Sequence, residues 1–233
     1  HIESVESKAA RMADITIAVS QSDEQYIQKL CGKSLKTAII PTIHPVVDGL
    51  EKYENREGIL FVGGFQHDPN VDAVKFLTME VLPRVQQKLG PIELTIIGSN
   101  ATSEIFELQG ESVNVLGWVE DLLPHYNSHK MVVAPLRYGA GVKGKIGEAL
   151  SHGIPTVTTS VGVEGMPLVN GQDILFADTA DEIADAVVKV YNDEKLWTSL
   201  SLNGQRKIDS LVGSEALRKM VDDLLDQVSG LKA

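Results

Sequence analysis

Cysteine, long apolar runs and positive charge are all scarce in this chain of 233 residues. Cys31 is the only cysteine, so no intramolecular disulfide can form, and this favours a reducing setting. The apolar runs, such as MVVAPL at residues 131–136, are far shorter than a membrane span, and the N-terminus carries no secretory signal. The sequence therefore predicts a cytoplasmic protein without a membrane-spanning segment.

Acidic residues outnumber basic ones, with 32 Asp and Glu against 21 Lys and Arg and a net charge of −11. Because no dense basic run stands against this background, a nucleic-acid partner is not expected. Hydrophobic residues make up 43% of the chain, enough for a substantial core. The chain begins with His1 and enters directly into a helical pattern, so we expect a fragment of a longer protein.

Eight short apolar runs with helical patterns between them predict an α/β fold built on a parallel sheet. The runs are apolar throughout rather than alternating, which is typical of strands covered by helices on both faces. They are DITIAVS (14–20), TAIIP (37–41), GILFVG (58–63), ELTIIG (93–98), VNVLGW (113–118), MVVAPL (131–136), PTVTTS (155–160) and ILFAD (174–178).

Start signals predict the helices between these runs. Asp68-Pro69-Asn70 precedes a helix over 71–85, and Thr179 is the expected cap of a helix over 180–193. Two further helical patterns close the chain without a strand between them, over 195–212 and 214–228.

A polar segment at 48–57, DGLEKYENRE, separates the first two strands from the other six and predicts a linker. Residues 1–47 are then the end of one domain, of which most is missing. Residues 58–212 form a second domain, and 213–233 form a C-terminal helix.

The stretch YGAGVKGKIGEALSHGIPTV, from Tyr138 to Val157, follows an apolar strand and opens a helix. Free amides at a helix N-terminus attract anions, and glycines let a phosphate approach the backbone. Lys143 and Lys145 add two positive charges at this point. A ligand that carries phosphate is therefore expected here.

Two phosphate motifs overlap in this loop. Gly139, Gly141 and Gly144 match the dinucleotide fingerprint G-x-G-x-x-G, with Glu164 twenty residues further on as a candidate ribose ligand. However, the loop follows roughly the fourth strand of its sheet rather than the first. The P-loop alternative fails because Ile146 stands where a Ser or Thr should bind Mg²⁺.

The helix itself suggests a third interpretation. Val142, Ile146, Ala149 and Leu150 form an apolar stripe, which leaves Gly141, Gly144, Lys145, Glu148 and His152 on a face that can meet a ligand. Lys145 and Glu148 lie about 4.5 Å apart along the axis, which suits a lysine on phosphate and a carboxylate on ribose hydroxyls. The alternative is a solvated ion pair between these two residues, but Lys before Glu is the less favourable order on a helix.

The stretch from Tyr138 to Met166 resembles the donor-binding signature of the retaining GT-B glycosyltransferases, group 1 or family four. Residues 59–74, 113–122 and 170–187 resemble other parts of the same nucleotide-sugar-binding domain. The resemblance covers about 58–212, and it implies a Rossmann-like parallel sheet. The first two strands resemble the end of the acceptor-binding domain that precedes it in this family.

The resemblance also implies roles for individual residues. Glu148 matches the ribose-binding glutamate, while Lys143 and Lys145 match the basic positions that stabilise the departing diphosphate. The loop residues Gly63 and Gly64 match positions that face the diphosphate. The amides from Gly139 to Gly141 match positions that face the donor sugar and phosphate. Trp118 and Val119 match the nucleobase contact.

This sequence departs from the family pattern in two places. Many members carry an earlier glutamate in an E-x7-E pattern, and Ala140 stands at that position here, which puts a direct carboxylate contact to the donor sugar in doubt. The Arg and Lys often found in the first glycine loop are absent from GGFQHDPN, and this moves phosphate neutralisation onto Lys143 and Lys145.

The prediction is a glycosyltransferase of polysaccharide biosynthesis, represented by its donor-binding half and inactive as an isolated fragment. Its substrate is a nucleotide-diphosphate sugar, with no other cofactor and no metal. A sugar, lipid-linked or protein acceptor, and any peripheral membrane contact, would use the missing part. Two alternatives stay open: a non-catalytic nucleotide-sugar or nucleotide-binding module, and an NAD-dependent oxidoreductase.

Other residues offer weaker chemistry. His125 and His129 have the spacing of two metal ligands on a helix, but Tyr126 and the lack of a third nearby ligand argue against a zinc motif. Glu164 either closes over the donor or begins a turn, and Trp118 either stacks near the base or lies in the core.

Overall fold

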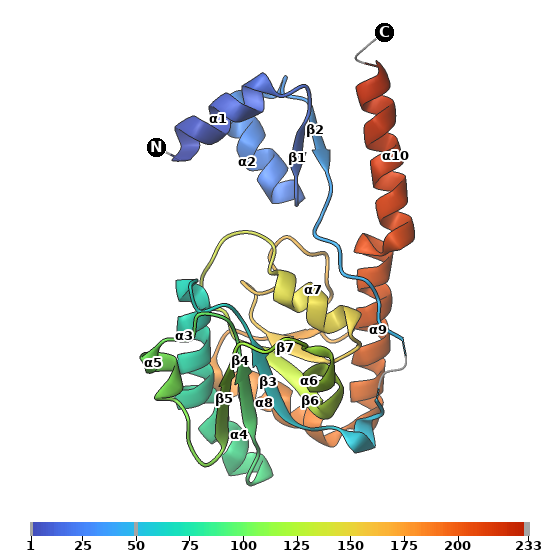
Figure 1. Ribbon diagram of the computed structural model, residues 1–233. Coiled ribbons are helices and arrows are strands. Elements are labelled where there is room, and N and C mark those ends of the chain that lie inside the picture. The colour runs from blue at the N-terminus through green and yellow to red at the C-terminus, as the bar shows by residue number, and fades with distance from the viewer. Residues whose placement is uncertain (1, 49–50, 231–233) are drawn as a thin grey trace. The chain divides into compact units, whose positions relative to one another are not determined.

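The computed structural model of the protein describes residues 2–48 and 51–230 (Figure 1). The chain divides into two compact units. One combines His1–Pro45 with Asp209–Ala233, and the other is Val46–Ile208.

The predicted linker at 48–57 falls near the start of the larger unit, and its residues 49 and 50 lie outside the described part of the chain. A short 3-10 helix, η1 (Tyr53–Asn55), comes next, and the first strand of the larger unit begins at Glu57. Of the predicted C-terminal helix at 213–233, residues 231–233 also lie outside the described part.

The smaller unit contains the first two predicted strands, which pair in parallel. Ser20 caps the helix between them, because its hydroxyl accepts a hydrogen bond from the Asp23 amide at 3.1 Å. The elements are α1 (Ile2–Met12), β1 (Thr16–Ala18), α2 (Gln21–Cys31), β2 (Thr37–Ile39) and α10 (Ser214–Gly230).

The larger unit is built on a six-stranded sheet in which every pair of neighbours is parallel. The strand order is β5-β4-β3-β6-β7-β8. This confirms the predicted α/β fold with a parallel sheet. The strands are β3 (Glu57–Val62), β4 (Leu94–Ile97), β5 (Val113–Gly117), β6 (His129–Ala134), β7 (Thr156–Thr158) and β8 (Leu175–Phe176).

The strand order reverses direction between β3 and β6. The chain runs outward from β3 to β4 and β5, then returns to place β6 against the other side of β3, with Ile59 beside Met131. Loops that leave two such neighbouring strands go to opposite faces of the sheet, and ligands of open α/β sheets bind between them.

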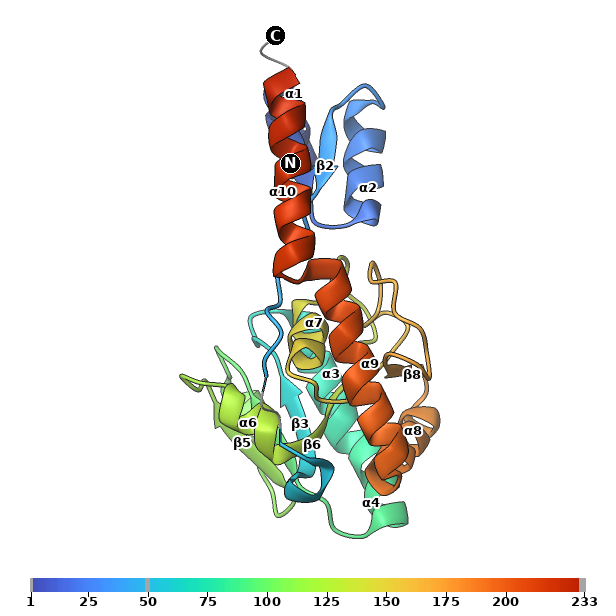
Figure 2. The same cartoon turned by 90° about the vertical axis from the view of Figure 1, so that its right-hand side faces the viewer.

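Helices cover both faces of this sheet (Figure 2). On one face lie α3 (Asp68–Phe76), a π-helical turn η2 (Leu77–Val81), α4 (Leu82–Leu89) and α8 (Ala180–Asn192). On the other lie α6 (Leu123–Ser128) and α7 (Gly144–Ser151). The remaining helices are the short α5 (Ser103–Phe106) and the long α9 (Glu194–Val212).

The helix predicted over 71–85 is interrupted by the π-helical turn η2. Pro83 lies in the first turn of α4 and has no N–H to donate to the preceding turn, which is a known cause of such irregularity. The predicted cap at Thr179 is confirmed, since Thr179 and Glu182 form a reciprocal capping box.

The central strands are buried on both faces, and adjacent residues such as Ile59, Leu60 and Phe61 are all inaccessible to solvent. The expectation that every strand is covered on both faces is wrong for β1 and β2, where Ile17 and Ile39 are exposed, and for β5. Val113 and Val115 are buried, but Leu116 is 39% exposed. As an edge strand, β5 has a helix-covered face and an open one.

Candidate functional site

The predicted glycine loop lies at the point where the strand order reverses. The loop over residues 63–67 follows β3, and the loop over 135–143 follows β6. We call these two segments the switch-point loops. The first leads into α3 on one face of the sheet and the second into α7 on the other (Figure 2). Because β6 is the fourth strand of this sheet, the loop is not where the NAD fingerprint belongs.

The conformation of the second switch-point loop requires its glycines. Gly139 has a φ of 122° and Gly141 a φ of 77°, values that side chains disfavour. A Cβ atom on Gly139 would also approach Pro69 to 3.3 Å. Lys143 occupies the N-cap position of α7, so the free amides of the first turn follow the loop directly.

The apolar stripe predicted for α7 faces the protein. Ile146, Ala149 and Leu150 are buried, but Val142, the fourth predicted member, lies in the loop before α7 and is only half-buried. The burial of Ile146 is a second reason why the P-loop motif does not apply, since this position cannot present a group to Mg²⁺. The opposite face carries Lys145 and Glu148.

Lys145 is held between the two switch-point loops. Its ammonium donates a hydrogen bond to Asn70 Oδ1 and lies 5.1 Å from the centre of the Phe61 ring. A Cβ atom at Gly63 would come within 2.6 Å of Lys145 Nζ, so a larger residue at this position would displace the ammonium. In the described chain no carboxylate lies within ion-pair distance of this ammonium. Burial, and then the charge of Lys143, lower the pKa of Lys145 to about 8.

Lys143 turns inward onto its own loop. Its ammonium donates to the carbonyl oxygens of Gly139, at 3.0 Å, and of Gly141, and lies 3.6 Å from Glu164 Oε2. Its side chain is only 10% exposed. In this arrangement Lys143 links two carbonyl groups of the glycine loop, and Glu164 partly compensates its charge. The sequence did not indicate these contacts.

Glu148 is half-buried one turn further along α7, and burial raises the pKa of its carboxyl group. It does not form an ion pair with Lys145 in the described structure, so the alternative of a solvated Lys145–Glu148 pair is wrong. Behind it lies Tyr126, whose buried ring stacks on His152 with centroids 4.5 Å apart. Burial, and then the Glu148 charge, raise the pKa of Tyr126.

The carboxyl ends of β3, β4 and β5 are tied together beside the first switch-point loop. The Gly63 amide donates to Ile97 O at 3.0 Å, and the Gly98 amide donates to Gly117 O at 2.8 Å. Gly64 lies close to Ser99, since an added Cβ would come within 3.2 Å of Ser99 Oγ. This network places the segment after β5 on the same edge of the sheet as Gly63.

Trp118 and Val119 are the first residues after β5. The Trp118 side chain is 69% exposed, so the alternative that it belongs to the core is wrong. Val119 is half-buried. An exposed indole at this edge is free to stack on a flat ring.

Asn70 is the residue that sequence reasoning missed. The sequence indicates it only as part of a helix start, yet it is 8% exposed and contacts both Lys145 and the carbonyl oxygen of Gly64. Its position three residues after His67 does not indicate this role, because Asn70 and Lys145 are far apart in the sequence and meet only in the folded chain.

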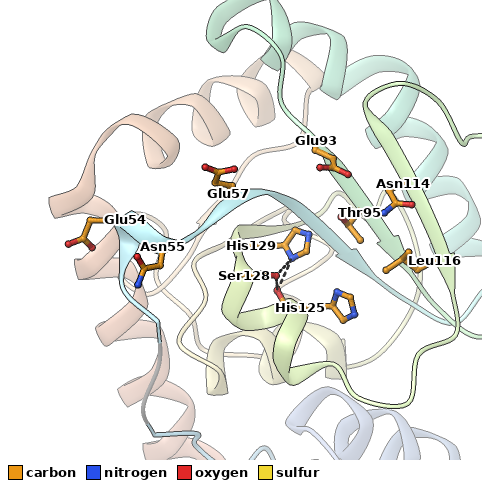
Figure 3. Close-up of a pocket in the computed structure, with 10 residues that line it drawn as sticks. All are labelled: Glu54, Asn55, Glu57, Glu93, Thr95, Asn114, Leu116, His125, Ser128 and His129. Carbon is orange, nitrogen blue, oxygen red and sulfur yellow. Dashed lines mark hydrogen bonds between the residues drawn. The ribbon is translucent and has the colours of Figure 1, made fainter.

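A separate cavity of about 550 Å³ extends from the amino ends of β3 and β6 along β4 and β5 as far as Leu116 (Figure 3). Glu57 and His129, the first residues of β3 and β6, line it together with Glu54 and Glu93. Its carboxylates would repel a diphosphate, so this cavity is not the candidate site for one.

His125 also lines this cavity, and its carbonyl oxygen lies 2.7 Å from His129 Nδ1. Burial lowers the pKa of His129. In the part of the chain that the structure describes, no three His, Cys, Asp or Glu side chains are grouped to hold a metal ion.

Comparison with known families gives a match to the model for glycosyl transferases group 1 over residues 56–193. The chain belongs to the group 1 glycosyltransferases. The residues matched include both switch-point loops, α7 and Glu164.

Two curated relatives match this chain, and one of them is named for capsular polysaccharide biosynthesis. One is an uncharacterized 44.6 kDa protein in the cps region of Klebsiella pneumoniae, 27% identical over 78% of this chain and 46% of that protein. The other is the capsular polysaccharide biosynthesis glycosyltransferase CapM of Staphylococcus aureus, 28% identical over 60% of this chain and 40% of that protein. This glycosyltransferase chain thus spans under half the length of both relatives.

The fold of the chain matches a crystal structure of a TarM variant from Staphylococcus aureus, solved with UDP, fondaparinux and a GlcNAc-glycerol. The TM-score is 0.77 at 16% identity, over 95% of this chain and 46% of that one. The match supports the GT-B assignment of the fold. None of the helices in the described residues of this glycosyltransferase is long and apolar enough to cross a membrane.

Proposed function

We propose that this chain is the donor-binding half of a glycosyltransferase that takes a sugar from a nucleotide-diphosphate sugar and transfers it with retention. The observation that carries the proposal is the Lys145 ammonium, which lies between the switch-point loops with no carboxylate of the described residues within ion-pair distance. A buried cation without a protein counter-ion favours an anionic ligand, and the free amides of α7 add to this preference.

In this proposal the site stabilises the diphosphate as it leaves the sugar. Lys145 and the first amides of α7 are fixed where negative charge grows during transfer, which is the arrangement that lowers a barrier electrostatically. Lys143 reaches the diphosphate by exchanging Glu164 or a loop carbonyl for a phosphate oxygen. Gly63 and Gly64 leave room for the phosphates, as do Gly139 and Gly141. No metal or other cofactor is needed for this neutralisation.

The nucleoside lies on the other side of Lys145 in the proposal. Glu148, one turn along α7, accepts hydrogen bonds from the ribose hydroxyls, and the exposed Trp118 and neighbouring Val119 contact the base. The UDP in the TarM structure supports a uridine nucleotide as the first donor to test. The names of the capsule relatives support a sugar acceptor in polysaccharide synthesis, bound by parts beyond this chain. On its own the chain would bind donor and transfer nothing.

The proposal predicts a specific pH dependence for UDP binding. Burial lowers the pKa of Lys145 to about 8, and a bound diphosphate would raise it again. The free chain therefore loses this proton above pH 8 while the complex retains it, so affinity falls about tenfold per pH unit there. The charge of the diphosphate itself is constant in this range, because its last pKa is about 6. Calorimetric titrations from pH 7 to 9.5 measure the slope, and a chain that fails to bind UDP, GDP and ADP refutes the proposal.

Glu148 provides a test of the ribose contact. We expect Glu148→Gln to weaken UDP binding about fivefold, because charge-assisted hydrogen bonds become neutral ones, worth about 1 kcal/mol less in total. Inorganic pyrophosphate lacks ribose, so its dissociation constant should change less than about twofold by the same reasoning. Equal losses for UDP and pyrophosphate in parallel titrations would contradict the assigned role.

One observation favours the alternative function, that of a non-catalytic nucleotide-sugar-binding module. Ala140 lies exposed between Gly139 and Gly141, where many family members carry a glutamate. Release of sugar from UDP-sugars by the whole protein separates the two functions, since a binding module leaves the donor intact.

A further inference from the structure

Asn70 connects three segments that meet at the candidate site. It lies in the first turn of α3, its side-chain amide donates to the Gly64 carbonyl oxygen at 2.7 Å, and its amide oxygen accepts from Lys145. The residue is 8% exposed. One buried carboxamide therefore contacts the first switch-point loop and the lysine of α7 at the same time.

The chemistry of this position requires a group with both a donor and an acceptor. A carboxamide has both, whereas a carboxylate has no N–H for the Gly64 carbonyl and an aliphatic side chain has neither. In the described chain, Asn70 Oδ1 is the one hydrogen-bond acceptor that the Lys145 ammonium contacts. The neighbouring Phe61 ring and the bare backbone of Gly63 complete its surroundings.

The contact is not needed to join α3 to the second switch-point loop. Arg137 of that loop already forms a two-pronged ion pair with Asp72 of α3, with Arg137 Nε 2.8 Å from Asp72 Oδ2. Asn70 adds something different, because it is directed at the end of a flexible lysine side chain. A neutral acceptor orients the ammonium while leaving its charge uncompensated.

We propose that Asn70 is a positioning residue, which holds the Lys145 ammonium between the switch-point loops so that its full charge is available to a diphosphate. The inference rests on the proposed function for its ligand. A lysine that is already fixed loses less conformational freedom when the ligand binds. Asparagine at this position therefore raises affinity without touching the nucleotide itself.

Asn70→Asp and Asn70→Ala test the inference in the full 233-residue chain. A carboxylate at position 70 would pair with Lys145, neutralise it and raise its pKa. We expect Asn70→Asp to weaken UDP binding about 100-fold, because the new carboxylate compensates the charge of Lys145. The pH above which UDP affinity falls, here called the pH break, should rise by more than one unit. Asn70→Ala should weaken binding about tenfold, through loss of one hydrogen bond to a charged group.

Asn203→Asp is the matched control. Asn203 lies in α9 and donates from its side-chain amide to a backbone carbonyl, that of Gln172, at 3.3 Å. The control makes the same change of charge and the same loss of a donor, and it should leave UDP affinity and the pH break unchanged. Thermal unfolding of each variant shows that it is folded.

NMR titration of the Lys145 side chain separates this inference from the proposed function. We expect its pKa near 8 in the natural chain and a clear rise in Asn70→Asp, whether or not a nucleotide binds. If UDP does not bind but Asn70→Asp raises the pKa of Lys145, the proposed function is wrong, while the contact between Asn70 and Lys145 is supported. A folded Asn70→Asp variant with the natural lysine pKa and the natural pH break would overturn the inference.

Discussion

Replacing Lys145 with methionine is expected to weaken UDP binding by roughly 10- to 100-fold, because a hydrogen bond to a charged group contributes about 1.5–3 kcal/mol. The same change should leave the chain as stable as before, or more stable. Among the residues that the structure describes, the buried Lys145 ammonium has no carboxylate partner, so its removal relieves a desolvation cost. Calorimetry gives the affinity, and thermal unfolding gives the stability.

The combination of weaker binding and retained stability identifies a functional residue, since sites that bind charge are often built at a cost to the fold. Lys88→Met is the control. Lys88 is exposed and pairs with Asp185 on the surface, so its loss should change neither quantity measurably. A Lys145→Met chain that binds UDP within twofold of the natural one would remove the central element of the proposed site.

Gly98→Ala is expected to lower the free energy of unfolding by about 3 kcal/mol or more, since it overpacks a site that is already filled. A Cβ atom at this position would lie 1.8 Å from the Gly63 carbonyl oxygen and 2.7 Å from Phe65 Cε2. The obstacle is backbone, which cannot rotate away as a side chain can. The first switch-point loop must therefore move, and its hydrogen bond from the Gly63 amide to Ile97 weakens with it.

The expected result is a melting temperature about 6 °C or more below that of the natural chain, from the usual scaling of free energy with melting temperature. Gly110→Ala is the matched control, because the nearest atom to its added Cβ is 3.9 Å away. The control should melt within about 2 °C of the natural chain on the same scaling. A Gly98→Ala chain that melts at the same temperature as the control would show that the first switch-point loop and the segment after β4 are not packed as closely as the structure indicates.

Local residue patterns were sufficient to predict the six strands of the larger unit. Runs such as GILFVG and MVVAPL are apolar at every position, and this composition is typical of a strand covered on both faces. The glycines at 139 and 141 predicted a loop that side chains disfavour, and both have positive φ values. The pattern failed at β5, because a run of five residues does not reveal that one of its faces is left open.

The candidate site shows the same division between local and distant information. Sequence spacing predicted that Lys145 and Glu148 share one face of a helix, since helical geometry is repeated at every turn. It did not predict the inward turn of Lys143 onto Gly139 and Glu164, or the contact between Asn70 and Lys145, 75 positions apart.

The amino-acid sequence by itself determined the class of fold, the glycine loop and the charged face of the helix that follows it. These features depend on periodicity and on backbone preferences within a few residues. Only the tertiary structure decided which groups meet Lys145. The return of β6 to the side of β3 sets that arrangement, because it brings the ends of two distant strands together and leaves a lysine between them with an amide, rather than a carboxylate, as its partner.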